Sequence, residues 1–409
     1  MRTLIPRATR FAVAAAVLSG AALSLGGQAH ASSAVAAQLQ VAPETGWGYV
    51  NTSGMFRFDS GSAYLSAPAS QSGSSSGSVQ VRRDNGPAHK FTVRLSGMGT
   101  SENKNMPGVV HVTRGLHQIG SPAGSLTADG HCTPSTPQSI DGDLLVDVKC
   151  YNQSDQYDMN ATFTLTYAQG SGIEGTGSRT MMRVDSPPTS TQSVTPPLQG
   201  STTGKVATVS GTGTAGSYLV HLPVLSGPSA LAVTATLDSG FDKSCSLGST
   251  SLVGSPAWQE VQVKCTRTST GQPVNSAFSV TDVAQTNFAG SYYRLSAAHA
   301  QVPLIPVSDN LTSPAIRYNR IYGSDSGGVF VQHAASGRYN VLLANQQWSD
   351  TKTNAATVMV TPQKSTASCV VDDTHYDSGS NYQTAVIDCR NNKGEHTDSA
   401  FHLTYMAKQ

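Results

Sequence analysis

The sequence predicts an all-β protein made of three tandem antiparallel β-sandwich repeats, each with one local disulfide. Short runs in which every second residue is apolar recur along the 409-residue chain. This period of two gives a strand one buried and one solvated face. No apolar pattern with the 3.6-residue period of a helix extends over a useful length. A unit made of such a run, a cysteine, a polar turn and a phenylalanine occurs three times.

The repeated unit is defined by a cysteine that ends an alternating run and a phenylalanine that opens the next. The phenylalanine follows its cysteine by 13, 13 and 12 residues in the three copies, and an asparagine or aspartate stands three places before it. We therefore expect each phenylalanine to be the buried anchor of an equivalent strand. In chain order the residues are Cys150, Asn160 and Phe163, then Cys265, Asn275 and Phe278, then Cys389, Asp398 and Phe401.

Other alternating runs align between the copies. An aromatic-x-Val-x-Leu run occurs once in each copy, which predicts that its central valine faces inward. The polar residues beside the phenylalanine anchors are expected to face solvent. The central valines are Val93, Val220 and Val341, and the polar neighbours are Thr164, Ser279 and His402.

Two further sets of runs complete each copy. We align residues 233–236 with residues 110–113 and 358–361, and we align the leading stretches 48–50, 181–184 and 291–295 with one another. Each copy then holds about seven short strands separated by Gly, Ser, Pro and Asn turns, which is typical of a β-sandwich.

Composition divides the chain into five parts. Arginines precede an apolar stretch over residues 11–25, and Ala29-His30-Ala31 fits a small-x-small cleavage site, which predicts a signal peptide at residues 1–31. The apolar stretch is short and is followed by two glycines, which disfavours a membrane anchor. No membrane span is therefore expected after cleavage. The other parts are a flexible N-terminus at residues 32–44 and β-sandwich repeats at residues 45–170, 177–285 and 288–409.

Six cysteines are expected to form one disulfide in each repeat. They allow fifteen connectivities, and spacing alone does not choose among these. The repeat does choose, because each copy holds two cysteines at equivalent places, and an oxidising compartment converts such pairs to disulfides. On the chain-entropy model, a disulfide that closes a loop of this length stabilises the folded chain by about 3 kcal/mol. The expected pairs are Cys132–Cys150, Cys245–Cys265 and Cys369–Cys389.

The order of these features resembles the tandem repeats of secreted proteins from high-GC Gram-positive bacteria. The shared features are a Ser/Thr-rich leader, the aromatic-x-Val-x-Leu run, a Val-x-Val-Thr run, a first cysteine, and Val-x-Val-x-Cys with its turn and phenylalanine. The resemblance covers nearly all of residues 45–407. It implies a β-repeat fold with one cysteine pair per repeat and an extracellular address. That family is functionally uncharacterised, so the resemblance carries over no catalytic residues.

Composition also narrows the class of partner. Charged residues make up 12% of the chain and the formal net charge is +1. A nucleic-acid binder needs a clustered Lys/Arg face, so no nucleic-acid partner is expected. No phosphate-binding glycine loop or zinc-helix motif occurs in the sequence, and no cofactor is expected.

One pair of residues resembles a serine-protease site. His299 and Ser326 lie in stretches similar to the histidine and nucleophile motifs of trypsin-like enzymes. Only 26 residues separate them, far fewer than the two-barrel fold of those enzymes requires. We therefore expect no catalytic role for either residue.

A second group could be read as a metal site. Asp372, Asp373, His375 and Asp377 lie in the loop between the third pair of cysteines, and such residues can ligate Ca²⁺ or a transition metal. Their spacing is not that of an EF-hand, and the other two repeats lack an equivalent. A solvated hairpin turn is the interpretation we favour, with metal binding left open.

The function expected from these features is secreted and non-catalytic. We expect adhesion or binding at the cell wall, the extracellular matrix or a protein partner, so that the ligand is an extracellular glycan or protein, bound by loops at the sandwich ends. Trp47, Trp258 and Trp348 could stack on sugars or pack on the sandwich faces. Two alternatives stay open, a structural extracellular spacer with no specific ligand and an unrecognised secreted hydrolase.

Overall fold

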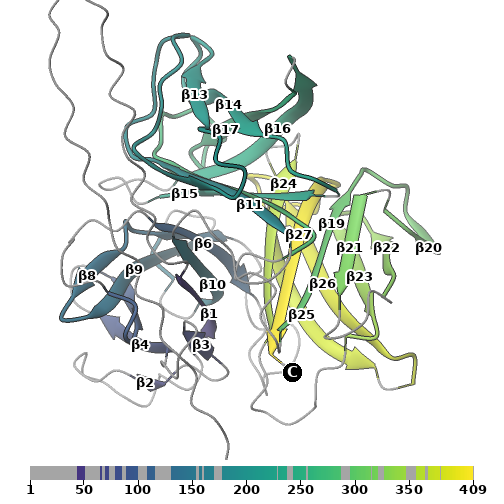
Figure 1. Cartoon of the computed structure of the whole chain (residues 1–409). Helices are drawn as coiled ribbons and strands as arrows, with labels where there is room; N and C mark the ends of the chain where they lie inside the picture. Colours follow the sequence, from purple (N-terminus) through teal and green to yellow (C-terminus); the bar gives the residue numbers. More distant parts are fainter. Residues whose placement is uncertain are drawn as a thin grey trace, which may run out of the picture. The chain divides into compact units, whose positions relative to one another are not determined.

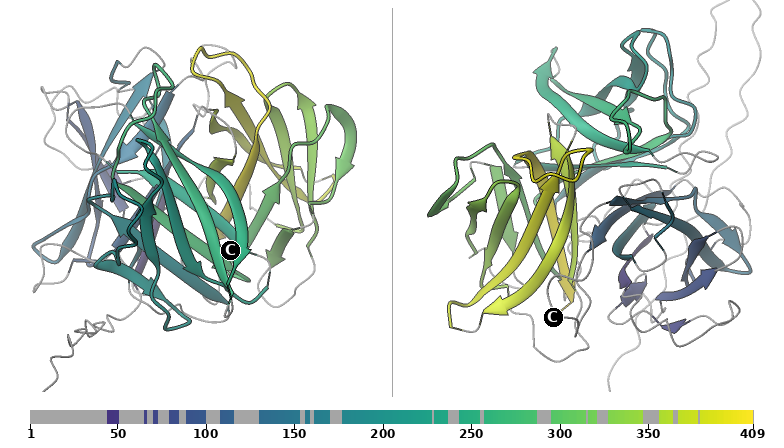
Figure 2. Two further views of the ribbon diagram at one scale, coloured as in Figure 1. Left: turned by 90° about the horizontal axis from the view of Figure 1, so that it is seen from above. Right: turned by 180° about the vertical axis from the view of Figure 1, so that it is seen from behind.

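A computed structural model describes most of the chain after residue 43, and every element in that part is a β-strand (Figures 1 and 2). The all-β prediction is confirmed. The predicted signal peptide and nearly all of the predicted flexible N-terminus lie outside the described residues. The described residues are 44–50, 65–66, 70–72, 79–84, 89–99, 108–115, 130–152, 156–158, 161–169, 177–227, 229–236, 243–254, 257–286, 295–314, 316–320, 327–346, 356–363, 367–377 and 379–408.

Three clusters of buried apolar side chains divide the strands into three segments. In the first segment, the cluster draws on two groups of strands in the orders β3-β1-β10-β6 and β2-β4-β5-β9-β7, with β8 beside β9. The strands are β1 (Glu44–Val50), β2 (Leu65–Ser66), β3 (Ser70–Ser72), β4 (Val79–Asp84), β5 (Lys90–Leu95), β6 (Gly108–Gly115), β7 (Gly130–Pro134), β8 (Gln138–Ile140), β9 (Asp143–Asn152) and β10 (Thr162–Gln169).

The second segment repeats this arrangement with eight strands. Its two groups have the orders β12-β11-β18-β15 and β13-β14-β17-β16, and both contribute to the second cluster. The strands are β11 (Ser178–Val184), β12 (Leu198–Ser201), β13 (Thr208–Gly211), β14 (Ser217–Pro223), β15 (Ser229–Ala235), β16 (Ser244–Val253), β17 (Trp258–Thr266) and β18 (Phe278–Ala284).

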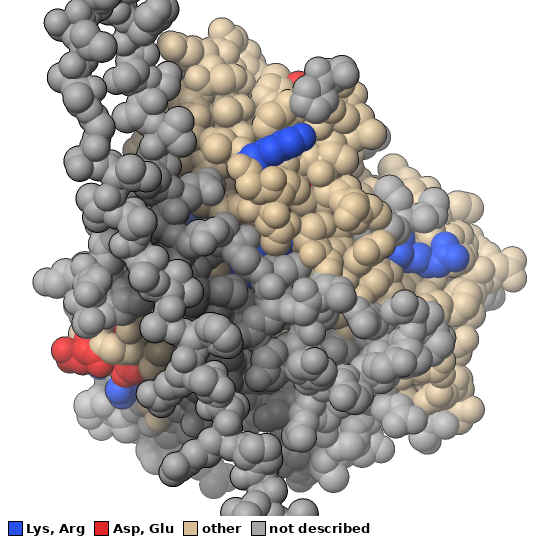
Figure 3. Space-filling view, in the orientation of Figure 1, with Lys and Arg blue, Asp and Glu red and all other residues tan. Residues whose placement is uncertain are grey.

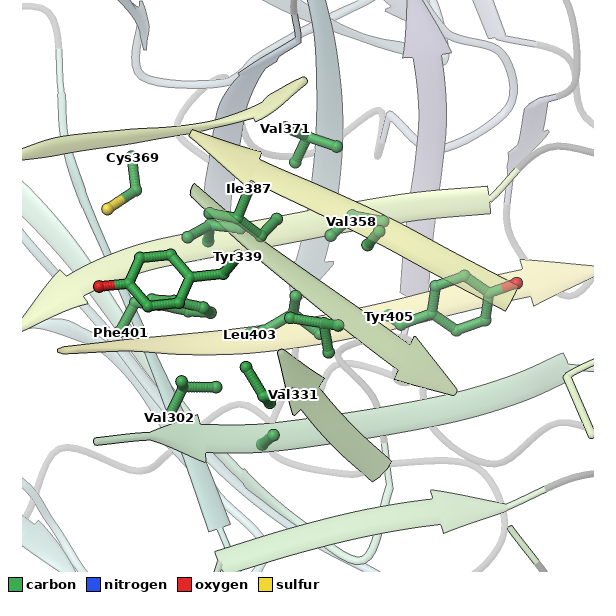
Figure 4. Packing of buried hydrophobic residues seen from close by; sticks show 14 of the residues in the cluster. Val302, Val331, Tyr339, Val358, Cys369, Val371, Ile387, Phe401, Leu403 and Tyr405 are labelled. Carbon is green, nitrogen blue, oxygen red and sulfur yellow. The ribbon is translucent and has the colours of Figure 1, made fainter. Parts of the chain in front are cut away.

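The third segment has two groups of strands, in the orders β21-β19-β27-β24 and β20-β22-β23-β26-β25. Figure 4 shows its cluster, in which Phe401, Leu403 and Tyr405 of one strand meet residues of the other group such as Tyr339 and Ile387. The strands are β19 (Leu295–Val302), β20 (Ser308–Thr312), β21 (Ile316–Arg320), β22 (Val329–Ala335), β23 (Arg338–Ala344), β24 (Ala356–Gln363), β25 (Ser368–Asp377), β26 (Tyr382–Arg390) and β27 (Ala400–Lys408).

The predicted anchors are buried in all three clusters. The side chains of the three phenylalanines and the three central valines have no exposed surface, because alternation places each of them on the inner face of its strand. The disulfides are Cys132–Cys150, Cys245–Cys265 and Cys369–Cys389, the pairs that the repeat pattern predicts. Each one joins directly paired residues of neighbouring antiparallel strands.

Strand register corrects two of the alignments. The anchors Phe163, Phe278 and Phe401 pair with Arg114, Ala235 and Pro362, so the threonines that precede these partners are equivalent. Residues 231–234, not 233–236, therefore match residues 110–113 and 358–361. Because Val302 pairs with Phe401 as Val184 pairs with Phe278, the residues that match 181–184 are 299–302 of β19 rather than 291–295. The equivalent threonines are Thr113, Thr234 and Thr361.

The polar residue three places before each anchor has a structural role. Asn275 Oδ1 accepts hydrogen bonds from the Gly216 amide at 2.8 Å and the Tyr218 hydroxyl at 3.1 Å. Asp398 Oδ1 accepts from the Gly337 amide at 2.7 Å in the same way. Both glycines have a positive φ of 68°, and a Cβ on Gly216 would collide with the carbonyl oxygen of Cys265. The conserved spacing of the motif therefore holds a tight turn beside the disulfide; Asn160 lies outside the described residues.

Backbone pairing between strands connects the segments to one another. One-residue parallel bridges join β25 to β6 at Val371 and Gly115, and β16 to β24 at Leu247 and Gln363. The sheets that contain these bridges have nine and eight strands and cross from one segment to another. Residues Gln40–Gln409 form one compact unit.

Candidate functional site

The three segments meet at β6, β15 and β24, which are equivalent strands and each contact the other two (Figure 1). β15 is the last strand of its sheet, and the sheets continue past β6 and β24 only through the one-residue bridges. These strands therefore present backbone groups that the sheets do not fully pair. We call their contacts the junction.

Side chains of the third segment cap the open edge of β15. The carbonyl oxygen of Ser229 accepts from Gln301 Nε2 at 3.0 Å, and the amide of Val233 donates to Thr361 Oγ1 at 3.2 Å. Between them, the amide of Leu231 donates to His402 Nδ1 at 3.0 Å. Alternate residues of a strand direct their backbone groups to the same side, so one edge is capped at three successive positions.

The first segment caps β24 by the equivalent residues. Thr113 Oγ1 accepts from the Val360 amide at 3.2 Å, and Thr164 Oγ1 donates to the Val358 carbonyl at 2.8 Å. Thr113 and Thr164 are paired across β6 and β10, as Thr361 and His402 are paired across β24 and β27. The same geometry thus joins the first segment to the third and the third to the second.

The second segment completes the circuit by contacting β6. Arg183, the equivalent of Gln301, donates to the Gly108 carbonyl at 3.2 Å. His111 of β6 makes side-chain hydrogen bonds to Thr234 at 3.0 Å and to Thr281 at 2.8 Å. Each segment therefore caps one neighbour and is capped by the other.

The junction overturns one prediction from the sequence. Thr164, Ser279 and His402 were expected to face solvent, but their exposed fractions are 4%, 0% and 1%. Their strands are buried on both faces, one face against the apolar cluster and the other against a neighbouring segment. In an isolated sandwich, polar residues on the outer face of a strand normally contact water. The sequence pattern therefore gives no sign that these strands pack against a neighbouring segment.

A small cavity of about 50 Å³ lies in the junction and is lined by all three segments. This volume holds a few water molecules. Arg114 and Lys243 contribute to its lining, yet their charged ends bind within their own segments. Arg114 forms an ion pair with Asp158, and Lys243 Nζ donates to the Asn275 carbonyl at 3.1 Å. The cavity suits ordered water or a small polar molecule.

Burial shifts the pKa of several groups in and near the junction. It lowers the pKa of His111 to about 3 and that of His402 to about 3, with the nearby His299 adding to the effect on His402. Burial also raises the pKa of Asp282 to about 7. Asp282 faces the second apolar cluster at the position that Tyr167 and Tyr405 occupy in the other segments.

The acidic group between the third pair of cysteines is engaged in separate local contacts. Asp372 binds Arg338 at 2.7 Å, and Asp373 lies 2.8 Å from His375 Nδ1. Asp377 accepts from Ser380 Oγ and from the Gly379 amide, which hold the pKa of its carboxyl below its usual range. Among the described residues, no group of three or more His, Cys, Asp or Glu side chains is arranged to hold a metal ion.

The protease-like pair is not brought together in the described part of the chain. His299 is fully buried on β19, stacked on Tyr318, and faces the junction side of its sheet. Ser326 lies outside the described residues, as do Trp348 and the side chain of Trp47. Trp258 is half-buried, with Lys205 Nζ 5.7 Å from its ring centroid.

On the face drawn in Figure 3, few of the described side chains are charged, and most of the described surface is uncharged. In the described part of the chain, no helix has the length and apolar character to cross a membrane. Comparisons with protein-family models, curated proteins and solved structures find no match to this chain.

Proposed function

We propose that the protein is a secreted, non-catalytic binding protein whose three segments are tandem β-sandwich repeats. Its role is adhesion at the cell wall, at the extracellular matrix or to a protein partner, with an extracellular glycan or protein as ligand. The signal-like N-terminus and the three disulfides support the extracellular address.

The junction is the observation that carries this proposal. Buried hydrogen bonds connect every pair of segments, so the loops of different segments are held in a fixed relation. A fixed relation suits a composite binding surface, because less freedom is lost when the ligand binds. A spacer is expected to extend its segments along a line rather than connect all three to one another. The junction therefore favours a binding protein over a spacer.

The test is incubation of the purified mature protein with the producer's own cell wall and culture supernatant, followed by identification of what co-sediments. We expect a glycan or a protein to be retained. Reduced and alkylated protein is the control, since it has the same composition without the fold. Absence of any retained molecule would support the spacer, and release of soluble wall fragments would support the hydrolase.

A further inference from the structure

The three caps of the junction differ in one chemical respect. At equivalent positions beside the capping threonines the segments carry Thr164, Ser279 and His402. Hydroxyl groups do not titrate in the physiological range, whereas imidazole does. The contact between the second and third segments therefore has a titratable residue where the other two have a hydroxyl. His111, in the contact between the first and second segments, is also an imidazole, but its partners are the hydroxyls of Thr234 and Thr281, which can accept as well as donate.

The hydrogen bond of His402 requires the neutral imidazole. Its Nδ1 accepts from the Leu231 amide at 3.0 Å, so the lone pair of Nδ1 is in use and the ring proton is on Nε2. Protonation of Nδ1 would convert this acceptor into a donor that points at an N–H group. The bond would be lost and two donors would face each other inside a buried contact.

The described strands that pack around His402 carry no counter-charge for the imidazolium. β15, β19 and β24 pack around His402, and the described residues of these strands include no Asp or Glu. The ionisable group that faces it is His299 of β19, which carries charge of the same sign when protonated. Nε2 of His402 has no hydrogen-bond partner among the described residues. Asp282 is the register partner of Leu231, but its side chain faces the apolar cluster and its raised pKa keeps it mostly neutral in acid.

We infer that His402 is an acid-sensitive latch that holds the third segment on the open edge of β15 and releases it as the pH falls. Release exposes the amides of Leu231 and Val233 while the disulfides and the apolar clusters stay intact. The contact between the first and third segments, capped by Thr113 and Thr164, stays closed. A protein with this latch keeps its loops in a fixed relation at neutral pH and lets the second and third segments separate in an acidic medium.

The direction of the effect follows from proton linkage. The pKa of His402 is about 3 in the closed contact and returns toward 6.5 when the contact opens, so opening takes up a proton between these values. Acidification from pH 7 to pH 5 should therefore favour opening roughly 25-fold for this one group.

The test is residue-resolved amide hydrogen exchange on the full chain, corrected for the intrinsic exchange rate at each pH. Leu231 is expected to lose protection roughly 25-fold between pH 7 and pH 5, while Val360, capped by Thr113, keeps its protection. In His402→Asn, whose amide oxygen can accept near the position of Nδ1 without titrating, Leu231 should lose most of the pH dependence of its protection. The variant His221→Asn alters a half-buried histidine outside the junction and should leave the wild-type profile unchanged.

Two results would overturn the inference. One is a wild-type Leu231 whose protection does not change with pH, and the other is the same pH dependence in His402→Asn as in the wild type. If His402→Asn does not fold, the wild-type comparison of Leu231 with Val360 decides, because a global acid effect would lower the protection of both amides together.

Discussion

Thr361 of the third segment accepts a hydrogen bond from the backbone amide of Val233 in the second, and Thr113 of the first accepts one from Val360 of the third, both at 3.2 Å. The two contacts use equivalent threonines and equivalent edge amides. Unpaired edge strands are templates for association with other chains. The threonines therefore protect edges from non-specific pairing and connect the segments by the same bond.

The first prediction concerns this cap. Thr361→Val keeps the shape of the side chain and removes its acceptor, which leaves the Val233 amide buried without a partner. We expect a loss of about 1–3 kcal/mol in the free energy of unfolding, measured by denaturant titration. Thr214→Val, at an exposed turn, is the control and should change stability by under about 0.5 kcal/mol. Equal effects of the two substitutions would contradict the role of the cap.

The second prediction concerns cooperativity between the segments. Phe278→Ala opens a cavity in the second apolar cluster and should destabilise the protein by about 3–5 kcal/mol. Because the second segment caps the first and is capped by the third, limited proteolysis should expose cleavage sites in all three segments together.

Ser279→Ala is the matched control for Phe278→Ala. It changes the adjacent buried residue, whose hydroxyl has no hydrogen-bond partner in the described part of the structure, and should cost under about 1 kcal/mol. Cleavage confined to the second segment in Phe278→Ala would instead indicate three independent domains.

The third prediction separates backbone strain from steric collision at the turns. Gly204 and Gly216 have nearly the same positive φ, 69° and 68°, but a Cβ on Gly204 would meet open space. Gly204→Ala should therefore lower the free energy of unfolding only by the cost of placing an alanine in the left-handed conformation, about 1–2 kcal/mol. Gly216→Ala should cost more, because its Cβ would also collide with the Cys265 carbonyl. Thermal unfolding of the two variants measures the difference. Equal losses of stability would show that the turn at Gly216 moves to accommodate the added Cβ.

The fourth prediction concerns the pH dependence of stability. The pKa of Asp282 is about 7 in the folded chain and about 3.8 when unfolded. Because the folded pKa is higher than the unfolded one, Asp282 contributes stability to the fold that is complete below about pH 3.8. This stability is lost as the pH rises to about 7. Asp282→Asn does not titrate, so its stability relative to the wild type should increase from pH 4 to pH 8, by on the order of 4 kcal/mol.

Denaturant titrations of both proteins at the two pH values test this expectation. His111 and His402 act in the opposite direction, since their lowered pKa values remove stability as the pH falls below about 6.5. Both histidines are present in the wild type and in the variant, so their contribution cancels in the difference. A difference that does not change with pH would mean that Asp282 is ionised in the folded chain.

Alternation in the sequence was sufficient to predict the strands that carry the buried anchors, because one face of each packs on an apolar cluster. It predicted about seven strands in each copy, whereas the segments have ten, eight and nine, because short strands such as β3 and β20 do not alternate. It did not distinguish residues 231–234 from residues 233–236 as the partner of the other threonine runs. A shift of two residues leaves every side chain on the same face, so only the pairing of Phe278 with Ala235 resolves it.

The junction could not be predicted for a related reason. The polar pattern of Thr164, Ser279 and His402 is the same whether a second face meets water or another polar face. The one available signal was a threonine at the same place in all three copies, and the shifted alignment assigned it to Thr236 instead of Thr234. The cap on the Leu231 amide depends on the arrangement of two segments in space, which neither segment encodes alone.

The circuit of caps has a consequence for copy number. In an open array, each added repeat finds an unoccupied edge on the last one, and arrays of different length are equally well built. Here each of β6, β15 and β24 already receives the caps of a neighbour, so a fourth segment would find no uncapped strand equivalent to these three. Deleting one copy would leave one edge uncapped and one set of capping side chains without a target. Natural variation in this architecture should therefore lengthen or shorten loops and keep the number of segments at three.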